Sequence, residues 1–271
     1  MRTVICHFFN EAYLLPWWLK HHLTLFDHGV MIDHGSNDAS PDIVRAMAPH
    51  WRLVRSRLTH FDAYLTDFEV MGYEQELSGW KMALNVTEFV MPSEPLDIIE
   101  RELTRMGRAG CAASGMVVVD HQPEVRPATS LSLPAQKHWG LDDNAELQPQ
   151  LRLARGQTLG PHRNRFFHSS EVGMYYPGRH KSFHPDSGFR LLDLMVFHFG
   201  YAPWNADFVR RKIQIAAKLN PNDVQRDWGV EHLKKTDELQ RDYELIRASA
   251  TDLNAHLYAS RAIAYVSSLY T

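Results

Sequence analysis

The stretch that most constrains the fold is Val30 to Ser40, which reads VMIDHGSNDAS. Three apolar residues lead into an acidic turn that contains Gly35, and Ser40-Pro41-Asp42 then starts a helical pattern with a capping serine and an early proline. This order predicts a buried strand that delivers Asp33 to the carboxyl edge of a parallel sheet. Ligands of open α/β sheets bind at that edge, and a carboxylate there can accept hydrogen bonds from ribose hydroxyls or a base. A nucleotide is the first ligand to consider, although Asp, Asn, Ser and Gly are also ordinary turn residues.

Length and charge set limits on the class of protein. The chain has 271 residues, enough for one large domain or for one domain with an extension, and its formal net charge of −3 does not indicate nucleic-acid binding. Cys6 and Cys111 both lie in apolar runs, which favours reduced, buried thiols over a disulfide. No segment approaches the roughly 18 apolar residues of a membrane span. We expect a cytoplasmic protein whose membrane contact, if it has one, is peripheral to the inner membrane.

Predicted strands and helices alternate along the first half of the chain, and this alternation predicts an α/β fold with a mainly parallel central sheet flanked by helices. Adjacent His21 and His22 point in different directions on the first predicted helix, so we expect packing or solvent contact rather than metal binding. The predicted strands cover residues 3–9, 30–32, 52–55, 80–91, 111–119 and 191–199, with a β-hairpin at 163–176, and the predicted helices cover 12–26, 42–48, 66–77 and 95–106. Residues 122–161 contain five prolines and predict a long surface excursion.

No G-x-G-x-x-G or G-x-x-x-x-G-K-[ST] motif follows the first strand, so the chain lacks the usual sequence motifs of dinucleotide-binding and P-loop proteins at that position. Four segments, read together and in order, resemble glycosyltransferases of the GT-A fold, most closely bacterial proteins similar to family 2: HFFNEAYLLPWWLKHHL, VMIDHGSNDASPDIV, WKMALNVTEFVM and VFHFGYA. The likeness covers residues 3–91 and, after them, only two short segments near 172–181 and 196–201. It implies a GT-A-like nucleotide-sugar-binding and transferase domain at 1–202. Residues 203–271 read as a helical extension packed on that domain or on a second subunit.

The resemblance implies a nucleotide pocket in which Asp33 contacts the base or ribose. The pocket residues would be Asn10, Glu11, Asp33, Gly35 and Ser36. The D-x-D motif of the family, whose carboxylates hold Mn²⁺ or Mg²⁺, falls on Asn85-Val86-Thr87, where both carboxylates are missing. Glu88 survives, and His198 matches a histidine that some GT-A enzymes add to the metal shell. Hard divalent cations prefer carboxylate oxygens, so a metal is only weakly supported and no cofactor is certain.

Two interpretations follow from the missing carboxylates. In the first, the enzyme is metal-independent, and Arg179, His180 and Lys181 stabilise the departing diphosphate. In the second, the chain is a catalytically inactive GT-A-like protein that binds carbohydrate or nucleotide, or acts as a scaffold, in a glycan pathway. The candidate side chains also have purely structural explanations. Arg179, His180 and Lys181 can be solvated loop residues, His198 can be a hydrogen-bonded core histidine, and Glu88 can accept hydrogen bonds from backbone groups at a strand end.

The leading hypothesis is a glycosyltransferase that moves a sugar from a nucleotide-sugar donor to a glycan, lipid-linked or surface-polysaccharide acceptor. An inverting mechanism needs a base for the acceptor hydroxyl, and the candidates are Asp120, at a strand end, and Glu171, beside the predicted hairpin. The expected partners are the donor and the acceptor, with no nucleic acid. Peripheral membrane contact and a homo-oligomer are both compatible with the sequence.

Overall fold

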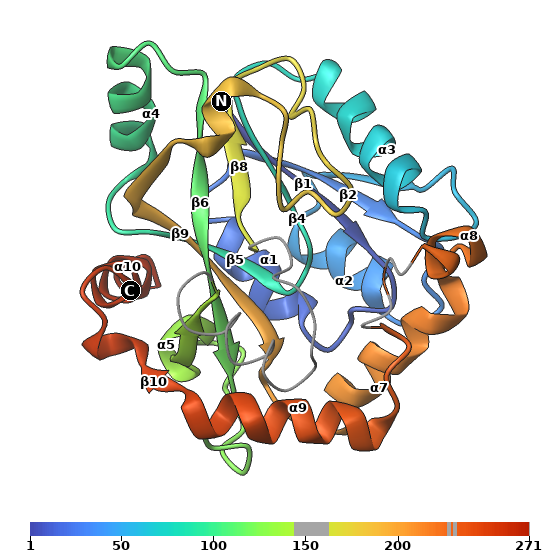
Figure 1. Ribbon diagram of the computed structural model, residues 1–271. Coiled ribbons are helices and arrows are strands. Elements are labelled where there is room, and N and C mark those ends of the chain that lie inside the picture. Colours follow the sequence, from blue (N-terminus) through green and yellow to red (C-terminus); the bar gives the residue numbers. More distant parts are fainter. Residues whose placement is uncertain (144–162, 227–228, 230–231, 271) are drawn as a thin grey trace.

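The structure, a computed structural model, describes residues 1–143, 163–226, 229 and 232–270. Its strands form one ten-stranded sheet with helices on its faces (Figure 1). The path through the sheet is β10-β7-β6-β8-β4-β1-β2-β3, and β9 pairs with β5 and β6 beside this path. The predicted α/β fold with a central sheet flanked by helices is confirmed.

The N-terminal half of the sheet is parallel. Its strands are β1 (Arg2–Phe8), β2 (His28–Asp33), β3 (Arg52–Arg55) and β4 (Trp80–Leu84). Helices α1 (Leu15–His22) and α2 (Ser40–Met47) cover one face, and α3 (Ala63–Gln75) covers the other. Side chains alternate between the faces of a strand, so Val4 and Cys6 join the first core cluster while Ile5 joins the second. The register aligns Phe8 with Asp33 and Asp33 with Arg55, so three strands end at one edge.

The second half of the sheet is mixed, so the expectation of parallel pairing holds only for the first half. β8 runs antiparallel to both β4 and β6, and β5 runs antiparallel to β9. The strands here are β5 (Glu88–Pro92), β6 (Gly110–Val119), β7 (Trp139–Asp142), β8 (Arg165–His168), β9 (Arg190–Tyr201) and β10 (Thr251–Asp252). Between them lie α4 (Leu96–Arg105), α5 (Leu133–Gln136) and the 3₁₀ turn η2 (Pro185–Gly188).

Three predictions differ from the structure. The surface excursion predicted at 122–161 contains α5 and β7, and β7 joins the sheet beside β6; residues 144–162 of this segment lie outside the described part of the chain. The single strand at 80–91 is interrupted after Leu84, because the Asn85 N–H donates to the Glu88 carboxylate at 2.7 Å and the Glu88 N–H donates back to the Asn85 carbonyl at 2.9 Å, which closes a turn. The predicted hairpin at 163–176 forms only its first strand. The Gly173 N–H donates to the Glu74 carboxylate at 2.7 Å, so the segment predicted as the second strand of the hairpin is bonded to α3 instead of to a neighbouring strand.

The C-terminal segment wraps around the sheet and packs on it. Ile263 and Val266 of α10 join the main core cluster, and Tyr243 and Ile246 of α9 pack with Val117 of β6. Its elements are α7 (Ala206–Gln214), η3 (Ile215–Lys218), α8 (Pro221–Gln225), α9 (Thr236–Ser249), η5 (Leu253–Ala255) and α10 (Ala259–Ser268). Among the residues described, none of the helices has the length and apolar character needed to cross a membrane.

His21 and His22 of α1 are both buried, and His21 Nε2 lies 2.7 Å from the Val90 carbonyl oxygen. Burial lowers the pKa of His21 to about 4, below its ordinary value of 6.5, although the Val90 bond opposes the shift. The folded state therefore favours neutral imidazole. Stability from this residue is complete above pH 6.5 and is lost as the pH falls toward 4.

We expect the His21 contribution alone to lower the free energy of unfolding by about 2 kcal/mol between pH 7.5 and pH 5. Urea denaturation of the wild type and of His21→Gln at pH 7.5 and pH 5 measures this contribution. Glutamine can keep a hydrogen bond but does not titrate. The variant is expected to lose this part of the pH dependence. Identical pH dependence in the two proteins would show that His21 is not held neutral.

Candidate functional site

The loops after β1 and β2 interlock at the carboxyl edge of the parallel strands. The Asn10 N–H donates to Ser36 Oγ at 2.9 Å, and the Ser36 N–H donates to Asp33 Oδ1 at 2.8 Å. The Asn37 N–H donates to Asn10 Oδ1 at 2.9 Å. Gly35 has φ 78°, in the left-handed region that glycine adopts without strain. The structure thus brings the predicted residues Asn10, Asp33, Gly35 and Ser36 together.

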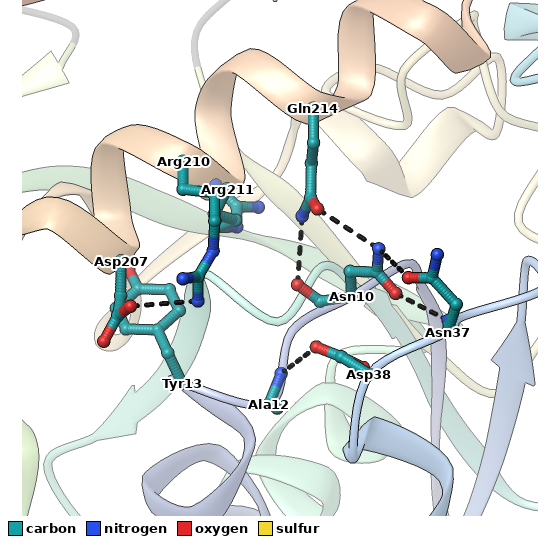
Figure 2. Close-up of a pocket in the computed structure, with 9 residues that line it drawn as sticks. All are labelled: Asn10, Ala12, Tyr13, Asn37, Asp38, Asp207, Arg210, Arg211 and Gln214. Carbon is teal, nitrogen blue, oxygen red and sulfur yellow. Dashed lines mark hydrogen bonds and ion pairs between the residues drawn. The ribbon is translucent and has the colours of Figure 1, made fainter.

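Helix α7 lies over this edge and occupies part of it (Figure 2). Arg211 Nε donates to both oxygens of the buried Glu11 carboxylate, at 2.6 and 2.7 Å. Gln214 Nε2 donates to the Asn10 carbonyl at 3.1 Å. A cavity of about 270 Å³ remains between α7 and the two loops, lined in part by Tyr13. Glu11, a predicted nucleotide ligand, is therefore committed to an ion pair with α7.

The turn after β4 carries a buried ion pair. Arg165 of β8 donates from Nη2 and Nε to the two Glu88 oxygens, at 2.5 and 2.7 Å, and both side chains are fully buried. A divalent ion here would need charged oxygen ligands. Asn85 and Thr87 carry no charge and Glu88 is used by Arg165, so the residues present do not fit a Mn²⁺ or Mg²⁺ site. Within the described residues, no three His, Cys, Asp or Glu side chains are placed to hold a metal ion.

His198, the second candidate metal ligand, lies opposite Glu88 in the antiparallel pairing of β5 with β9. Its Nδ1 is buried and has no hydrogen-bond partner within the described part of the chain. Burial, and after it the positive charge of Arg163, lowers the pKa of His198 well below its usual value, so the imidazole is neutral. His198 thus lies beside the turn, but the Glu88 carboxylate opposite it is paired with Arg165.

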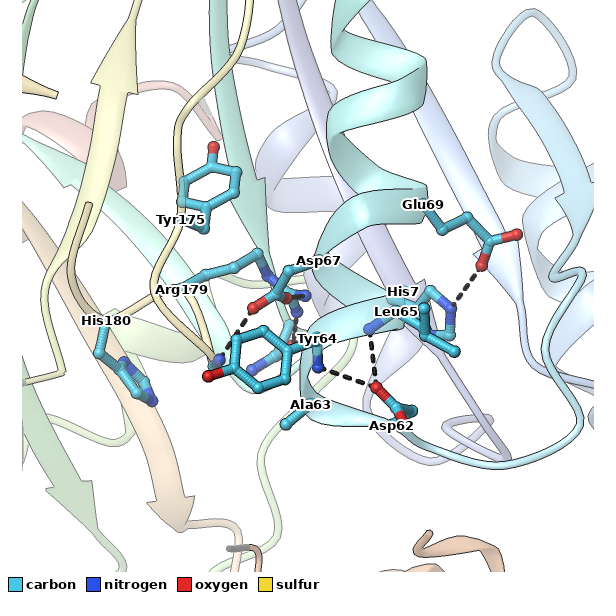
Figure 3. A network of polar contacts seen from close by, with 12 residues as sticks. His7, Asp62, Ala63, Tyr64, Leu65, Asp67, Glu69, Tyr175, Arg179 and His180 are labelled. Carbon is cyan, nitrogen blue, oxygen red and sulfur yellow. Dashed lines mark hydrogen bonds and ion pairs between the residues drawn. The ribbon is translucent and has the colours of Figure 1, made fainter. Parts of the chain in front are cut away.

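Arg179 extends from the loop after β8 to the same turn (Figure 3). Its guanidinium pairs with the buried Asp67 carboxylate of α3 and donates from Nη2 to Asn85 Oδ1 at 2.8 Å. The Gly178 N–H also donates to Asp67, at 2.9 Å, which fixes the loop against α3. Burial lowers the pKa of Arg179, but the carboxylates of Asp67 and Glu88 outweigh it and the net shift is upward. A permanent cation thus contacts Asn85, one of the two uncharged residues of this turn.

The three residues of the predicted cationic group do not act together. His180 Nδ1 lies 2.9 Å from Arg165 Nη1, and burial together with the Arg165 charge lowers the pKa of His180 well below its usual value. The neutral imidazole therefore accepts a hydrogen bond from Arg165. Lys181 is exposed at the surface of the loop. Arg179 and Arg165 provide the buried positive charge, and Lys181 lies outside this group.

Neither candidate base has a free carboxylate near Asn85. Asp120 is buried at the end of β6, where it accepts from Lys137 Nζ at 2.6 Å and from the Trp204 N–H at 3.0 Å. Glu171 is exposed and follows β8, whose end pairs with the beginnings of β4 and β6. That position is the amino edge of the parallel strands. The structure brings neither residue to the Asn10 and Asp33 loops with a carboxylate available for proton transfer.

No family model and no curated protein matches the chain. Among solved structures, it resembles glucosyl-3-phosphoglycerate synthase from Mycobacterium tuberculosis in complex with Mn²⁺, UDP and glucosyl-3-phosphoglycerate, with 15% identity over 66% of this chain and 61% of that chain, at a TM-score of 0.38. It also resembles residues 1–349 of S. aureus TarS in complex with UDP-GlcNAc, with 13% identity over 99% of this chain and 90% of that chain, at a TM-score of 0.37.

These neighbours are GT-A glycosyltransferases. A third structure, a putative nucleotide-diphospho-sugar transferase from Desulfovibrio desulfuricans, shares 10% identity over 43% of this chain and 58% of that chain, at a TM-score of 0.29. The chain spans about three fifths of the length of the first neighbour, 61%.

Proposed function

We propose that the protein is a glycosyltransferase that takes a sugar from a nucleotide-sugar donor and does not require a divalent metal. One observation carries this proposal: the carboxyl edge that holds Asn10 and Asp33 also holds Arg179, whose guanidinium contacts Asn85 at 2.8 Å. An acidic residue suited to a ribose or base and a buried cation suited to a diphosphate thus occur at the same edge of one sheet.

The chemistry of the reaction explains why the cation matters. As the bond between sugar and diphosphate breaks, negative charge develops on the departing nucleotide, and preorganised positive charge lowers the free energy of that transition state. Arg179 is held in place by Asp67 before any ligand arrives, so little reorganisation is needed. The acceptor is proposed to be a glycan, a lipid-linked sugar or a surface polysaccharide, and the protein is proposed to act in the cytoplasm.

A second candidate function is a catalytically inactive protein that binds nucleotide or carbohydrate in a glycan pathway. The observation that favours it is the ion pair of Glu11 with Arg211, which closes part of the edge with α7. Donor hydrolysis or sugar transfer separates the two candidates, since only the first turns over a nucleotide-sugar.

We expect Asp33→Ala to weaken nucleotide binding by about 1 to 3 kcal/mol, because a hydrogen-bonding carboxylate is lost from the site. The ligand is chosen first by a thermal-shift screen of UDP, GDP, CMP and dTDP sugars, which reports even weak binding at millimolar concentration. Calorimetry with that nucleotide then compares the wild type, Asp33→Ala and the control Asp42→Ala, whose carboxylate is exposed on α2 and forms an ion pair with Arg45. Equal affinity in all three proteins would place the nucleotide elsewhere.

A further inference from the structure

A buried carboxylate of α3 holds the beginning of the loop that follows β8. Glu74 accepts a hydrogen bond from the Gly173 N–H at 2.7 Å and another from the Tyr175 hydroxyl at 2.6 Å. His168 Nε2, at the end of β8, lies 3.2 Å from the Glu74 oxygen that Tyr175 contacts. All three side chains are buried, and a Cβ at Gly173 would lie 2.1 Å from Tyr175 Cζ, so glycine is needed for this ring to fold back against the loop. We call these contacts of Glu74 the first clamp.

A second carboxylate of α3 holds the end of the same loop. Asp67 accepts the Gly178 N–H at 2.9 Å and pairs with the Arg179 guanidinium (Figure 3). We call these contacts of Asp67 the second clamp. Asp67 precedes Glu74 by seven residues, so the two acids lie on one face of the helix, about 10.5 Å apart along its axis. Each carboxylate thus binds one backbone N–H and one side chain, at the two ends of the segment 173–179.

The backbone of this loop is strained at two positions. Met174 has φ 50° and Arg179 has φ 60°, both in the left-handed region that residues with a Cβ rarely adopt. Within the part of the chain that the structure describes, Asn10 is the third non-glycine residue with a positive φ. Such conformations cost free energy and persist only where the surrounding contacts fix them. The contacts of Glu74 lie on both sides of Met174, and those of Asp67 include Arg179 itself.

We propose that Glu74 and Tyr175 are positioning residues for Arg179: they fix the loop in the strained conformation from which the guanidinium reaches Asn85. Arg179 Nη2 donates to Asn85 Oδ1 at 2.8 Å. Without the first clamp, the backbone at the start of the loop can relax out of the left-handed region, and the contacts of Asp67 alone would hold the guanidinium. The importance of this position for binding a diphosphate rests on the proposed function, whereas the clamp itself does not.

Glu74 also has a structural role, because it lies near the buried Lys81 of β4. Burial lowers the pKa of Lys81, and the negative charges of Glu74 and Glu171 oppose that shift. A substitution of Glu74 would therefore disturb Lys81 as well as the loop. Tyr175→Phe separates the two roles, since it removes one hydrogen bond of the first clamp and leaves the Glu74 charge in place.

Hydrogen exchange of the free protein, followed by mass spectrometry, tests the first clamp. We expect Tyr175→Phe to raise the exchange rate about tenfold or more in peptides that cover residues 176–181, and to leave exchange in α4 as it is in the wild type. The matched control is Tyr73→Phe, which removes the same hydroxyl from a buried tyrosine of α3 whose ring lies beneath the Arg52 guanidinium. This variant is expected to exchange like the wild type in the same peptides.

A double-mutant cycle on nucleotide binding then tests whether the first clamp acts through Arg179. The ligand is the nucleoside diphosphate that the wild type binds best, and calorimetry measures its affinity. We expect Tyr175→Phe to lower that affinity about threefold to tenfold, and we expect Arg179→Gln and Tyr175→Phe/Arg179→Gln to bind equally. A purely structural role of Tyr175 would instead lower the affinity by the same factor in both backgrounds.

Circular dichroism melts establish that each variant is folded. Equal exchange rates in Tyr175→Phe and Tyr73→Phe would overturn the clamp. An affinity loss of the same size with and without Arg179→Gln would show that Tyr175 does not act through Arg179. If the wild type binds no nucleoside diphosphate, the proposed function fails and the role in diphosphate binding fails with it, while the exchange rates of the free protein still decide whether the clamp holds the loop.

Discussion

Replacing Arg165 with methionine is expected to lower the free energy of unfolding by about 3 to 5 kcal/mol. Arg165 satisfies both oxygens of Glu88, and both side chains are fully buried. Removing the guanidinium leaves the buried Glu88 carboxylate without its hydrogen-bonded countercharge, which costs more than the pair itself contributes. Urea denaturation followed by circular dichroism at pH 7 measures the change.

Two further variants make this result specific to the buried pair. The double variant Glu88→Met/Arg165→Met replaces both charges with apolar groups of similar volume and should recover much of the lost stability. Arg101→Met, which removes an exposed pair with Asp97 on α4, should change stability by about 0.5 kcal/mol or less. The assigned role of Arg165 would be contradicted if Arg165→Met lowered the free energy of unfolding as little as Arg101→Met does. It would also be contradicted if Glu88→Met/Arg165→Met were no more stable than Arg165→Met.

The sequence predicted the parallel half of the fold because its signals are local. Apolar runs, an N-terminal proline in α2 and the acidic turn after Asp33 each act over a few residues, and they place Asn10, Asp33 and Ser36 at one edge. The order of the motifs then indicated the GT-A class. The missing carboxylates at Asn85 and Thr87 were also visible directly, since they are single-residue differences within a matched segment.

The partners of those residues could not be predicted, because they come from distant parts of the chain. Arg211 reaches Glu11 across 200 residues and Arg165 reaches Glu88 across 77. No sequence pattern distinguishes such an arginine from a solvated one, although Arg165 does stand beside the apolar pair Phe166-Phe167, a setting that favours burial. Asp120 shows the converse, since its strand-end position is typical of a catalytic carboxylate while its contacts with Lys137 and Trp204 are structural.

Arg179→Gln is expected to weaken binding of a nucleoside diphosphate by about 2 to 5 kcal/mol, the usual cost of removing one partner from a buried, hydrogen-bonded charge pair. Glutamine can keep a hydrogen bond to Asn85 but brings no charge to the diphosphate. Lys181→Gln is the matched control from the same loop, because Lys181 is exposed and should change affinity little. A thermal melt of each variant, together with Asp67→Asn/Arg179→Gln, separates a loss of binding from a loss of folding caused by the uncompensated Asp67.

Calorimetric titration of the best-binding nucleoside diphosphate, first in EDTA and then in Mn²⁺, tests most directly whether Arg179 supplies the charge that a metal would otherwise provide. We predict that the wild-type affinity is nearly the same in the two buffers, and that Arg179→Gln lowers it in both. A rise of tenfold or more on adding Mn²⁺, about 1.4 kcal/mol, together with unchanged affinity in Arg179→Gln, would contradict this account and assign the charge to a bound metal.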